Sequence, residues 1–181
     1  MTETLNMCVR SAIDGAMRRL LAEKPFRKIT ITELVQTAGV GRSSYYRNYN
    51  SMEEIVFSCL NRLYDEYFQS RASAKGLYQK NTKAVLLSRY KFIKENADFF
   101  SALVRDGLLY PAYQNLTPEN VERMFGINFG NDRYFKSQML ASAASNIDIW
   151  VSGGFQESEN WLAEYTMRFM KFQKKILDHM E

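Results

Sequence analysis

The 181-residue sequence predicts an all-α protein with a small three-helix domain at residues 1–50 and a helical bundle at residues 51–181. Apolar residues recur at helical spacing along most of the chain. Helix start signals also recur, in which a Ser or Thr is followed three residues later by Glu. We expect about nine helices, with a helix over residues 51–71 linking the two domains.

Residues 28–56 predict two short helices joined by a tight turn and followed by a third helix. Thr30 and Glu33 form a capping box that starts a helix near residue 31, and Gly39 ends that helix because glycine adopts the left-handed conformation readily. A second helix is expected over residues 42–49. Ser51 and Glu54 repeat the capping box and open the next helix.

The helix at residues 42–49 is too short to be stable alone and must be held by its neighbours. Only Tyr45 and Tyr49 are expected to enter the core, so the other side chains present hydrogen-bond donors outward. Two short helices joined by a tight turn, with a polar outer face on the second, are typical of a DNA-reading helix-turn-helix.

The order and spacing of these residues resemble the amino-terminal domain of the TetR/AcrR transcriptional regulators. The resemblance rests on the segments 30–34 and 38–40, on Tyr46 and Tyr49, and on Ser51 and Glu54, and it covers residues 8–60. ENADFFSALVRDGL and IWVSGGFQES are similar to the DhaS-like branch of that family. The resemblance implies a homeodomain-like fold and a one-component regulator, most often a repressor, that responds to a small-molecule effector.

Two positions depart from the family pattern. Met52 stands where the family usually has a lysine that meets a phosphate, and Gly41 stands where a serine often caps the recognition helix. Both departures weaken the expected grip on double-stranded DNA.

Eight residues are the candidate DNA contacts, divided between phosphates and bases. Phosphate contacts are expected from Tyr46, Thr30 and Thr32. Residues facing the major groove are expected to be Arg42, Ser43, Ser44, Arg47 and Asn48.

The positive charge of the chain lies in the same segment. Residues 1–52 contain eight Lys or Arg and four Asp or Glu, whereas the other 129 residues contain sixteen of each. Positive charge there would release counterions from DNA phosphates. Charge alone is more typical of a solvated basic face, and the helix-turn-helix motif decides for DNA.

Cysteine and histidine usage argues against an enzyme, a metal site and a cofactor. Cys8 and Cys59 lie in helical patterns without a CxxC motif and are expected to be reduced core residues. The one histidine, His179, is expected to be a solvated residue near the end of a helix rather than a catalytic base. No apolar run approaches the ~20 residues that span a bilayer, so we expect a cytoplasmic protein with no membrane partner.

The remaining segments predict further helices and one interrupted region. The first helix is expected over residues 5–23, and another pair over residues 81–95 and from Asn96, as its cap, to residue 109. Residues 72–79 are expected to form a loop. Prolines and glycines break the pattern over residues 111–132, where Thr117-Pro118-Glu119 starts one short helix.

The last two helices, over residues 132–152 and 157–180, are expected to form an antiparallel pair separated by two glycines. An apolar stripe on the final helix offers more surface than one neighbour covers easily. The alternatives are an intramolecular core and a homodimeric four-helix bundle, which the resemblance implies. The residues expected in the dimer interface are Trp161, Tyr165, Phe169 and Phe172.

Large side chains of the second domain could line an effector pocket or form plain core. The candidate pocket residues are Phe92, Phe99, Phe100, Tyr113, Phe125, Asn146 and Trp150. With the family resemblance, the function expected is a ligand-responsive repressor that binds a palindromic operator as a dimer. The alternative is a co-regulator of the same fold that binds a partner protein instead of DNA, which Met52 and the modest net charge of +4 favour.

Overall fold

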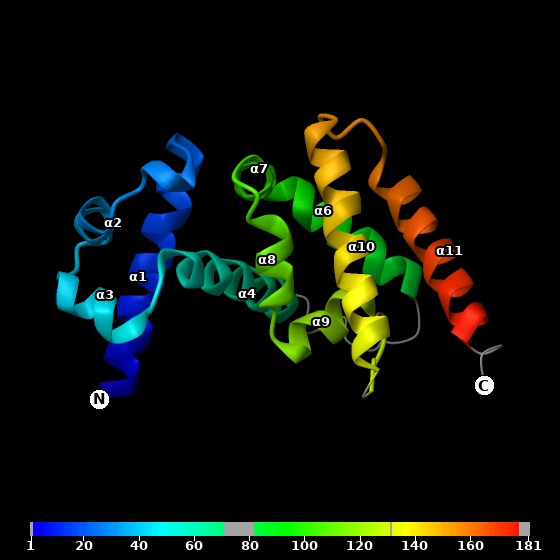
Figure 1. The fold of residues 1–181 in the computed structure, drawn as a ribbon, viewed down its shortest axis with the longest axis horizontal. Coiled ribbons are helices and arrows are strands. Elements are labelled where there is room, and N and C mark those ends of the chain that lie inside the picture. The colour runs from blue at the N-terminus through cyan, green and yellow to red at the C-terminus, as the bar shows by residue number, and fades with distance from the viewer. Residues whose placement is uncertain (1, 71–81, 131, 178–181) are drawn as a thin grey trace. The chain divides into compact units, whose positions relative to one another are not determined.

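A computed structural model describes residues 2–70, 82–130 and 132–177 of the chain. Within these residues it contains ten α-helices, one short 3-10 helix and no strand, which confirms the all-α fold class (Figure 1). The expected loop at residues 72–79 and the expected position of His179 lie outside the described residues.

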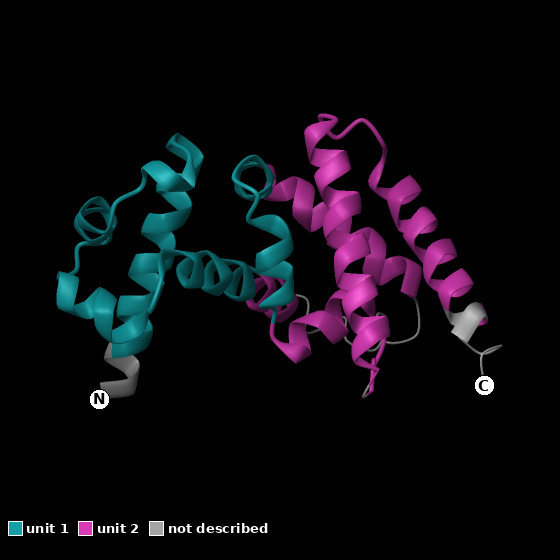
Figure 2. Ribbon diagram, viewed as in Figure 1, with its two compact units in different colours: residues 1–63, 98–116 teal, residues 64–97, 117–181 magenta. Residues whose placement is uncertain are grey.

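The described chain divides into two compact units that alternate along the sequence (Figure 2). Unit 1 comprises residues 1–63 and 98–116, and unit 2 comprises residues 64–97 and 117–181. The chain therefore leaves unit 1 within a helix, returns to it after residue 97 and leaves it again after residue 116. The domain boundary expected at residue 50 is a division by function and stays a prediction.

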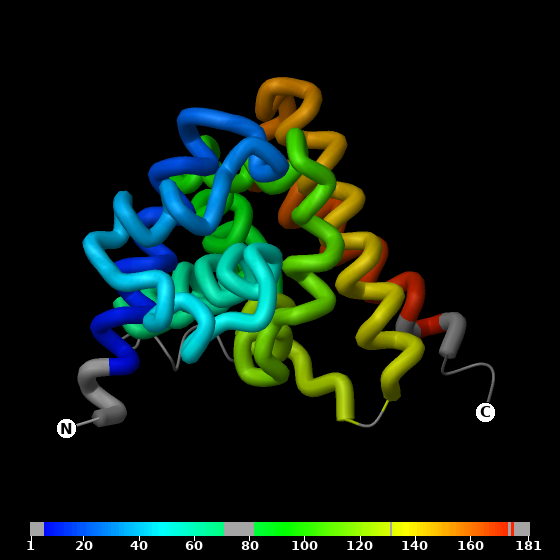
Figure 3. Tube along the Cα trace, turned by 60° about the vertical axis from the view of Figure 1, so that its left-hand side comes forward, coloured from blue at the N-terminus to red at the C-terminus, as the bar shows by residue number. Residues whose placement is uncertain are grey.

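Three helices of unit 1 build the amino-terminal domain: α1 (Thr2–Glu23), α2 (Ile31–Ala38) and α3 (Arg42–Asn48). A 3-10 helix, η1 (Phe26–Lys28), joins α1 to α2. The tube in Figure 3 follows α2 and α3 through the turn that separates them. Each of the three helices packs against the other two. Fully buried side chains of α1 and α2 form the core between them, among them Ile13, Met17, Leu21 and Leu34.

The helix α4 (Met52–Ser70) begins in unit 1 and ends in unit 2. Unit 1 is completed by α7 (Ala97–Arg105) and α8 (Leu109–Gln114). These two helices correct the expectation of one helix that runs to residue 109. Gly107 has a φ of 68°, which ends the first helix, and Pro111 lies in the first turn of the second, where a proline is tolerated. This break accounts for ten helices instead of nine.

Unit 2 contains α6 (Thr82–Glu95), α9 (Pro118–Phe125), α10 (Arg133–Ser152) and α11 (Glu159–Leu177). The central helix is α6, which packs against both α11 and α9. The ring of Trp150 on α10 meets the ring of Tyr90 on α6 edge to face at 5.6 Å. The Tyr90 hydroxyl lies 2.7 Å from the hydroxyl of Thr166 on α11, so a buried aromatic and polar cluster ties the three helices together.

The local start signals form as expected at Thr117, whose side chain caps α9 ahead of Pro118. Asn96 differs from its expected role. Its side-chain amide donates to the carbonyl of Phe92 at 2.9 Å, so Asn96 closes the end of α6 rather than capping the next helix. Cys8 also differs, because it is exposed on the first part of α1, whereas Cys59 is buried as expected.

Candidate nucleic-acid interface

The helix-turn-helix begins at Thr30, whose hydroxyl accepts a hydrogen bond of 3.2 Å from the backbone N–H of Glu33. Gly39 ends α2 with φ 68° and ψ 29°, as the sequence predicts. The second half of the capping box is absent from this described turn. The Glu33 carboxylate pairs with the Lys24 ammonium instead of returning to the Thr30 N–H. The Glu33 carboxylate thus has an ion-pair partner nine residues earlier in the chain in place of the local hydrogen bond.

The capping box at the start of α4 is also only half formed. The Ser51 hydroxyl accepts from the N–H of Glu54 at 3.1 Å, but the Glu54 carboxylate accepts from the N–H of Asn50 at 2.8 Å rather than from Ser51. The carboxylate also accepts from the side-chain amide of Asn50 at 3.1 Å. These bonds close the short connection between α3 and α4.

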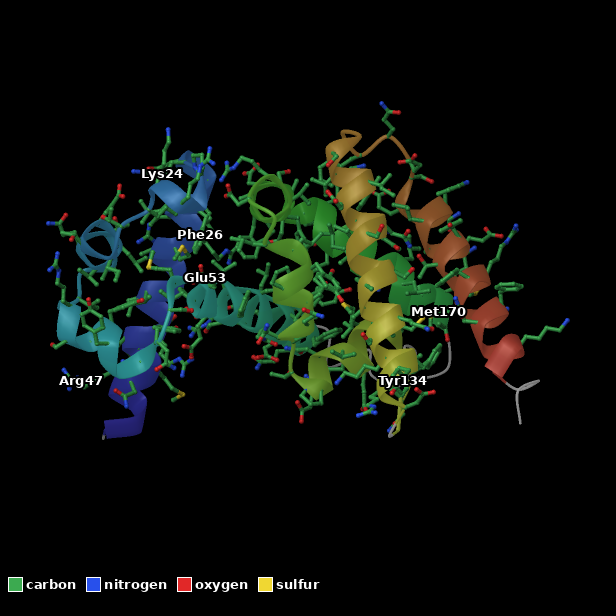
Figure 4. All side chains as sticks on the ribbon, in the orientation of Figure 1. Lys24, Phe26, Arg47, Glu53, Tyr134 and Met170 are labelled. Atoms are coloured by element: carbon green, nitrogen blue, oxygen red, sulfur yellow. The ribbon has the colours of Figure 1, made fainter. Side chains whose placement is uncertain are left out.

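The structure brings the eight candidate DNA contacts together on α3 and the first turn of α2. Six of them are exposed: Thr30, Thr32, Arg42, Ser43, Tyr46 and Arg47. Ser44 and Asn48 are half-buried. Figure 4 labels Arg47 on α3. The exposed polar face predicted for the recognition helix is therefore present.

Three of these side chains are held by bonds of their own. The guanidinium of Arg42 donates to the hydroxyl of Thr32, which joins the start of α3 to the first turn of α2. The Arg47 Nε donates to the carbonyl of Ser43 at 3.3 Å, and the Asn48 amide donates to the carbonyl of Ser44 at 2.8 Å. In this state Arg47 and Asn48 lie back along their own helix and would have to release these bonds to reach a base edge.

The three tyrosines of this segment divide into core and surface as expected. Tyr45 and Tyr49 are buried, whereas the Tyr46 side chain is 65% exposed. The rings of Tyr45 and Tyr46 meet edge to face with centroids 5.0 Å apart. This contact orients the Tyr46 ring and leaves its hydroxyl accessible to a phosphate.

Sequence reasoning missed the group that holds the end of α3. Asp14 on α1 is buried, and its carboxylate accepts hydrogen bonds from the hydroxyls of Tyr49 at 2.7 Å and Ser58 at 3.0 Å. Arg62 on α4 forms an ion pair with the same carboxylate at 2.9 Å. Asp14 therefore joins α1, the residue that ends α3, and α4.

Burial raises the pKa of both ionisable hydrogen-bond partners in this cluster, Asp14 and Tyr49. Burial raises the pKa of the Asp14 carboxyl, although the bonds from Tyr49 and the charge of Arg62 lower it in part. Burial and the bond to Asp14 also raise the pKa of the Tyr49 phenol. No local sequence pattern marks Asp14, because its partners lie 35 to 48 residues further along the chain.

Comparison with known families identifies this amino-terminal unit. Residues 13–59 match the family model described as bacterial regulatory proteins, tetR family. This segment is therefore similar to the DNA-binding domain of tetR-family regulators. The matched residues include α2, α3 and three members of the cluster, Asp14, Tyr49 and Ser58, so the match coincides with the candidate interface.

Two curated relatives agree with this assignment. An uncharacterised helix-turn-helix regulator of Haemophilus influenzae is 24% identical over 100 residues, which are 54% of this chain and 49% of the relative. The uncharacterised helix-turn-helix regulator YerO of Bacillus subtilis is 23% identical over 147 residues, which are 74% of this chain and 46% of the relative. The chain thus spans about half the length of the curated relatives it matches.

A solved structure of a TetR-family regulator from Streptomyces coelicolor shares the fold. It superposes with a TM-score of 0.54 at 15% identity and covers 96% of this chain and 83% of that chain. Together the family model, the two relatives and the shared fold support a TetR-family transcriptional regulator.

The candidate effector-pocket residues do not all lie in one compact unit. Unit 1 holds Phe99, Phe100 and Tyr113, all of them buried, while unit 2 holds the other four. Among these four, Phe92, Phe125 and Trp150 are buried and Asn146 is half-buried. The buried aromatic residues make contacts typical of packing, such as that between Phe92 and Tyr67, whose ring centroids are 4.4 Å apart.

The candidate dimer residues lie on the outer side of α11. Trp161, Tyr165 and Phe172 are 53%, 47% and 62% exposed, and Phe169 is half-buried. The rings of Trp161 and Tyr165 stack at 5.4 Å. The opposite side of α11 buries Leu162, Ala163, Thr166 and Met170, so the helix is apolar on both sides and its outer side has no cover within the described chain.

No group of three or more His, Cys, Asp or Glu side chains in residues 2–70, 82–130 and 132–177 could hold a metal ion. None of the described helices is long and apolar enough to cross a membrane.

Proposed function

We propose that this TetR-family chain is a cytoplasmic, ligand-responsive repressor that binds a palindromic operator as a homodimer. The observation that carries the proposal is the exposed polar face of α3, where Arg42, Ser43, Tyr46 and Arg47 stand together beside Thr30 and Thr32. A face of this kind can contact both phosphates and base edges in the major groove.

A dimer follows from the size of the recognition element. The helix α3 has seven residues, which read too few base pairs to select one site, so two copies would have to bind half-sites about 34 Å apart. The outer apolar side of α11 supports this assembly, because two copies could bury Trp161, Tyr165 and Phe172 against each other in a four-helix bundle.

The effector is proposed to act through the separation of the two recognition helices. A ligand in unit 2 would tilt α4, which runs from unit 1 into unit 2. Because the half-sites have a fixed spacing, a small change in that separation lowers affinity for the operator.

A second candidate is a co-regulator that keeps the fold and binds a partner protein. The observation in its favour is Met52, a half-buried thioether at the first position of α4 where the family usually has a phosphate-binding lysine. The two candidates differ in whether the chain selects a DNA sequence at all.

Selection of bound duplexes from a random pool, followed by variants of α3, tests the proposal. We expect enrichment of a palindrome. Arg47→Ala should then lower affinity for that duplex by about tenfold or more and leave a scrambled duplex within a few-fold. Tyr46→Phe should weaken both duplexes alike. A chain that enriches no sequence would favour the co-regulator, and unchanged affinity for both variants would place the interface elsewhere.

A further inference from the structure

The end of α7 is bonded to the end of α1, more than eighty residues earlier in the chain. The terminal nitrogen Nη2 of Arg105 donates to the carbonyl oxygens of Leu21 at 3.0 Å and Lys24 at 2.9 Å. The same nitrogen lies 2.7 Å from the carboxylate of Asp106. All four residues belong to unit 1.

These bonds supply what the end of α1 lacks locally. The last four carbonyl groups of a helix have no partner within it, and a cation near them is favourable. The last turn of α1 contains no basic residue, so Arg105 brings the missing positive charge from α7. A second contact nearby joins the same helices, since the guanidinium of Arg18 lies 5.5 Å from the centre of the Phe99 ring.

Asp106 holds the segment that follows α1. Its side chain is only 9% exposed, and its carboxylate accepts a hydrogen bond of 3.0 Å from the backbone N–H of Phe26. Phe26 is the first residue of η1, directly after Pro25. Arg105 thus bonds the end of α1, and Asp106 bonds the start of η1. Figure 4 labels Lys24 and Phe26 at this connection between α1 and η1, which we call the corner. We call Arg105 and Asp106 the α7 clamp.

The corner continues into the DNA-reading helices. The ammonium of Lys24 pairs with the carboxylate of Glu33 in the first turn of α2, and the N–H of Glu33 is bonded to Thr30. At the other end of α2, Arg19 of α1 donates to the carbonyl of Thr37 at 3.1 Å. The direction in which α2 leaves α1 therefore depends on how the corner is held.

We propose that Arg105 and Asp106 are positioning residues for DNA recognition, which fix the orientation of the helix-turn-helix although they lie 46 or more residues beyond the matched family domain. The proposal rests on the proposed DNA-binding function. In this proposal the end of α7 supports the helix-turn-helix, so operator affinity depends on residues that do not touch the DNA.

Arg105 and Asp106 have opposite charges, so variants of the two residues can distinguish an effect of net charge from an effect of the hydrogen bonds. Arg105→Met removes a positive charge and Asp106→Ala removes a negative one. If the residues acted only through the net charge, the first variant would weaken DNA binding and the second would strengthen it. If they act by holding the corner, both variants weaken binding to the selected duplex, by about tenfold each.

The experiment measures the affinity of the full chain for a duplex selected by the wild-type protein and for an unrelated duplex of equal length. Each single variant should lose affinity for the selected duplex, and the double variant should lose no more than the larger single loss, because both residues serve one clamp. Arg133→Met is the matched control. It removes the same charge from an exposed arginine of unit 2 whose guanidinium bonds its neighbour Tyr134, and we expect less than a twofold loss.

Amide hydrogen exchange measured without DNA tests independently whether Arg105 and Asp106 stabilise the corner. In both variants the amides of Phe26 and Glu33 should exchange about tenfold faster, while those of α11 stay unchanged. Asp106→Asn, a milder variant, repeats the test if Asp106→Ala does not fold. Effects of opposite sign on the selected duplex, or unchanged exchange at residues 26–38, would overturn the proposal. If the wild-type chain selects no duplex, the proposed function fails and the exchange result still decides whether the clamp holds α2.

Discussion

The hydroxyl of Tyr49 donates a 2.7 Å hydrogen bond to the carboxylate of Asp14, which lies 35 residues earlier in the chain. Tyr49 is the residue that ends the recognition helix, and Asp14 lies in the buried face of α1. The orientation of the DNA-reading face is therefore set at its carboxyl end by a buried polar contact. Burial of a carboxylate is costly unless donors surround it, so each donor matters to the stability of unit 1.

Tyr49→Phe removes one of these donors without changing the packing of the ring. We expect the free energy of unfolding to fall by about 1.5–3 kcal/mol, the usual range for a hydrogen bond to a charged group. Urea denaturation monitored by circular dichroism measures the change. Tyr46→Phe is the matched control, because its ring is 65% exposed and its removal of a hydroxyl should change stability by less than about 0.5 kcal/mol. Equal effects of the two variants would contradict a special role for the buried hydroxyl.

The same cluster predicts how stability depends on pH. The pKa of Asp14 is raised by burial above its ordinary value of 3.8, so the folded state holds the proton more tightly than the unfolded state. Between pH 3.8 and the folded pKa the folded state therefore binds more protons. Its stability from this group falls as pH rises through that window.

Asp14→Asn removes the titration and keeps an oxygen that can accept from Tyr49. We expect the stability of the wild-type protein relative to this variant to decline as pH rises above 3.8. Urea unfolding of both proteins over the acidic range measures the difference, in which the other carboxyl groups cancel. A difference that grows with pH would mean that the ion pair with Arg62 outweighs burial.

Local chemistry explains why the helix-turn-helix was predictable from the sequence. Thr30 and Gly39 act within one turn of their own helices, and Tyr45 and Tyr49 face inward because of helical spacing alone. The contact from Arg105 to Leu21 was not predictable, since it spans 84 residues and each partner is unremarkable in its own segment. The ion pair of Glu33 with Lys24 was missed for a different reason, because the capping-box pattern predicts that the Glu33 carboxylate bonds the N–H of Thr30.

The break at Gly107 shows a second limit of sequence reasoning. The apolar spacing of residues 97–109 is compatible with one helix, and only the left-handed conformation of Gly107 reveals that the chain turns there. Likewise, Phe100 and Phe125 are both buried, one in each unit, and their role in an effector pocket stays a prediction. Composition cannot separate a pocket from a core without the three-dimensional arrangement.

Met52 offers a direct test of the DNA-binding hypothesis. It is half-buried at the first position of α4, beside the turn that follows the recognition helix. Met52→Lys should tighten binding to any duplex and steepen the dependence of log affinity on log salt by about 0.9, as one added phosphate contact requires. The positive charge at a helix start costs a few tenths of a kcal/mol, which such a contact outweighs. Titrations at several salt concentrations measure the slope, and an unchanged slope would show that residue 52 does not face the DNA backbone.

The last prediction concerns the homodimer interface proposed on the outer side of α11. Phe172 is 62% exposed, so a charge placed there leaves the core of unit 2 intact but would be costly inside a dimer interface. We expect Phe172→Glu to be a monomer by light scattering at micromolar concentration, to keep its helical circular dichroism and to lose affinity for a palindromic duplex. Tyr110→Glu serves as the control, because Tyr110 is a 42% exposed aromatic residue of α8 in unit 1, and it should remain a dimer. A wild-type chain that is itself monomeric at this concentration would refute both the interface and the two-half-site mechanism, because neither recognition helix would then have a partner at a fixed distance.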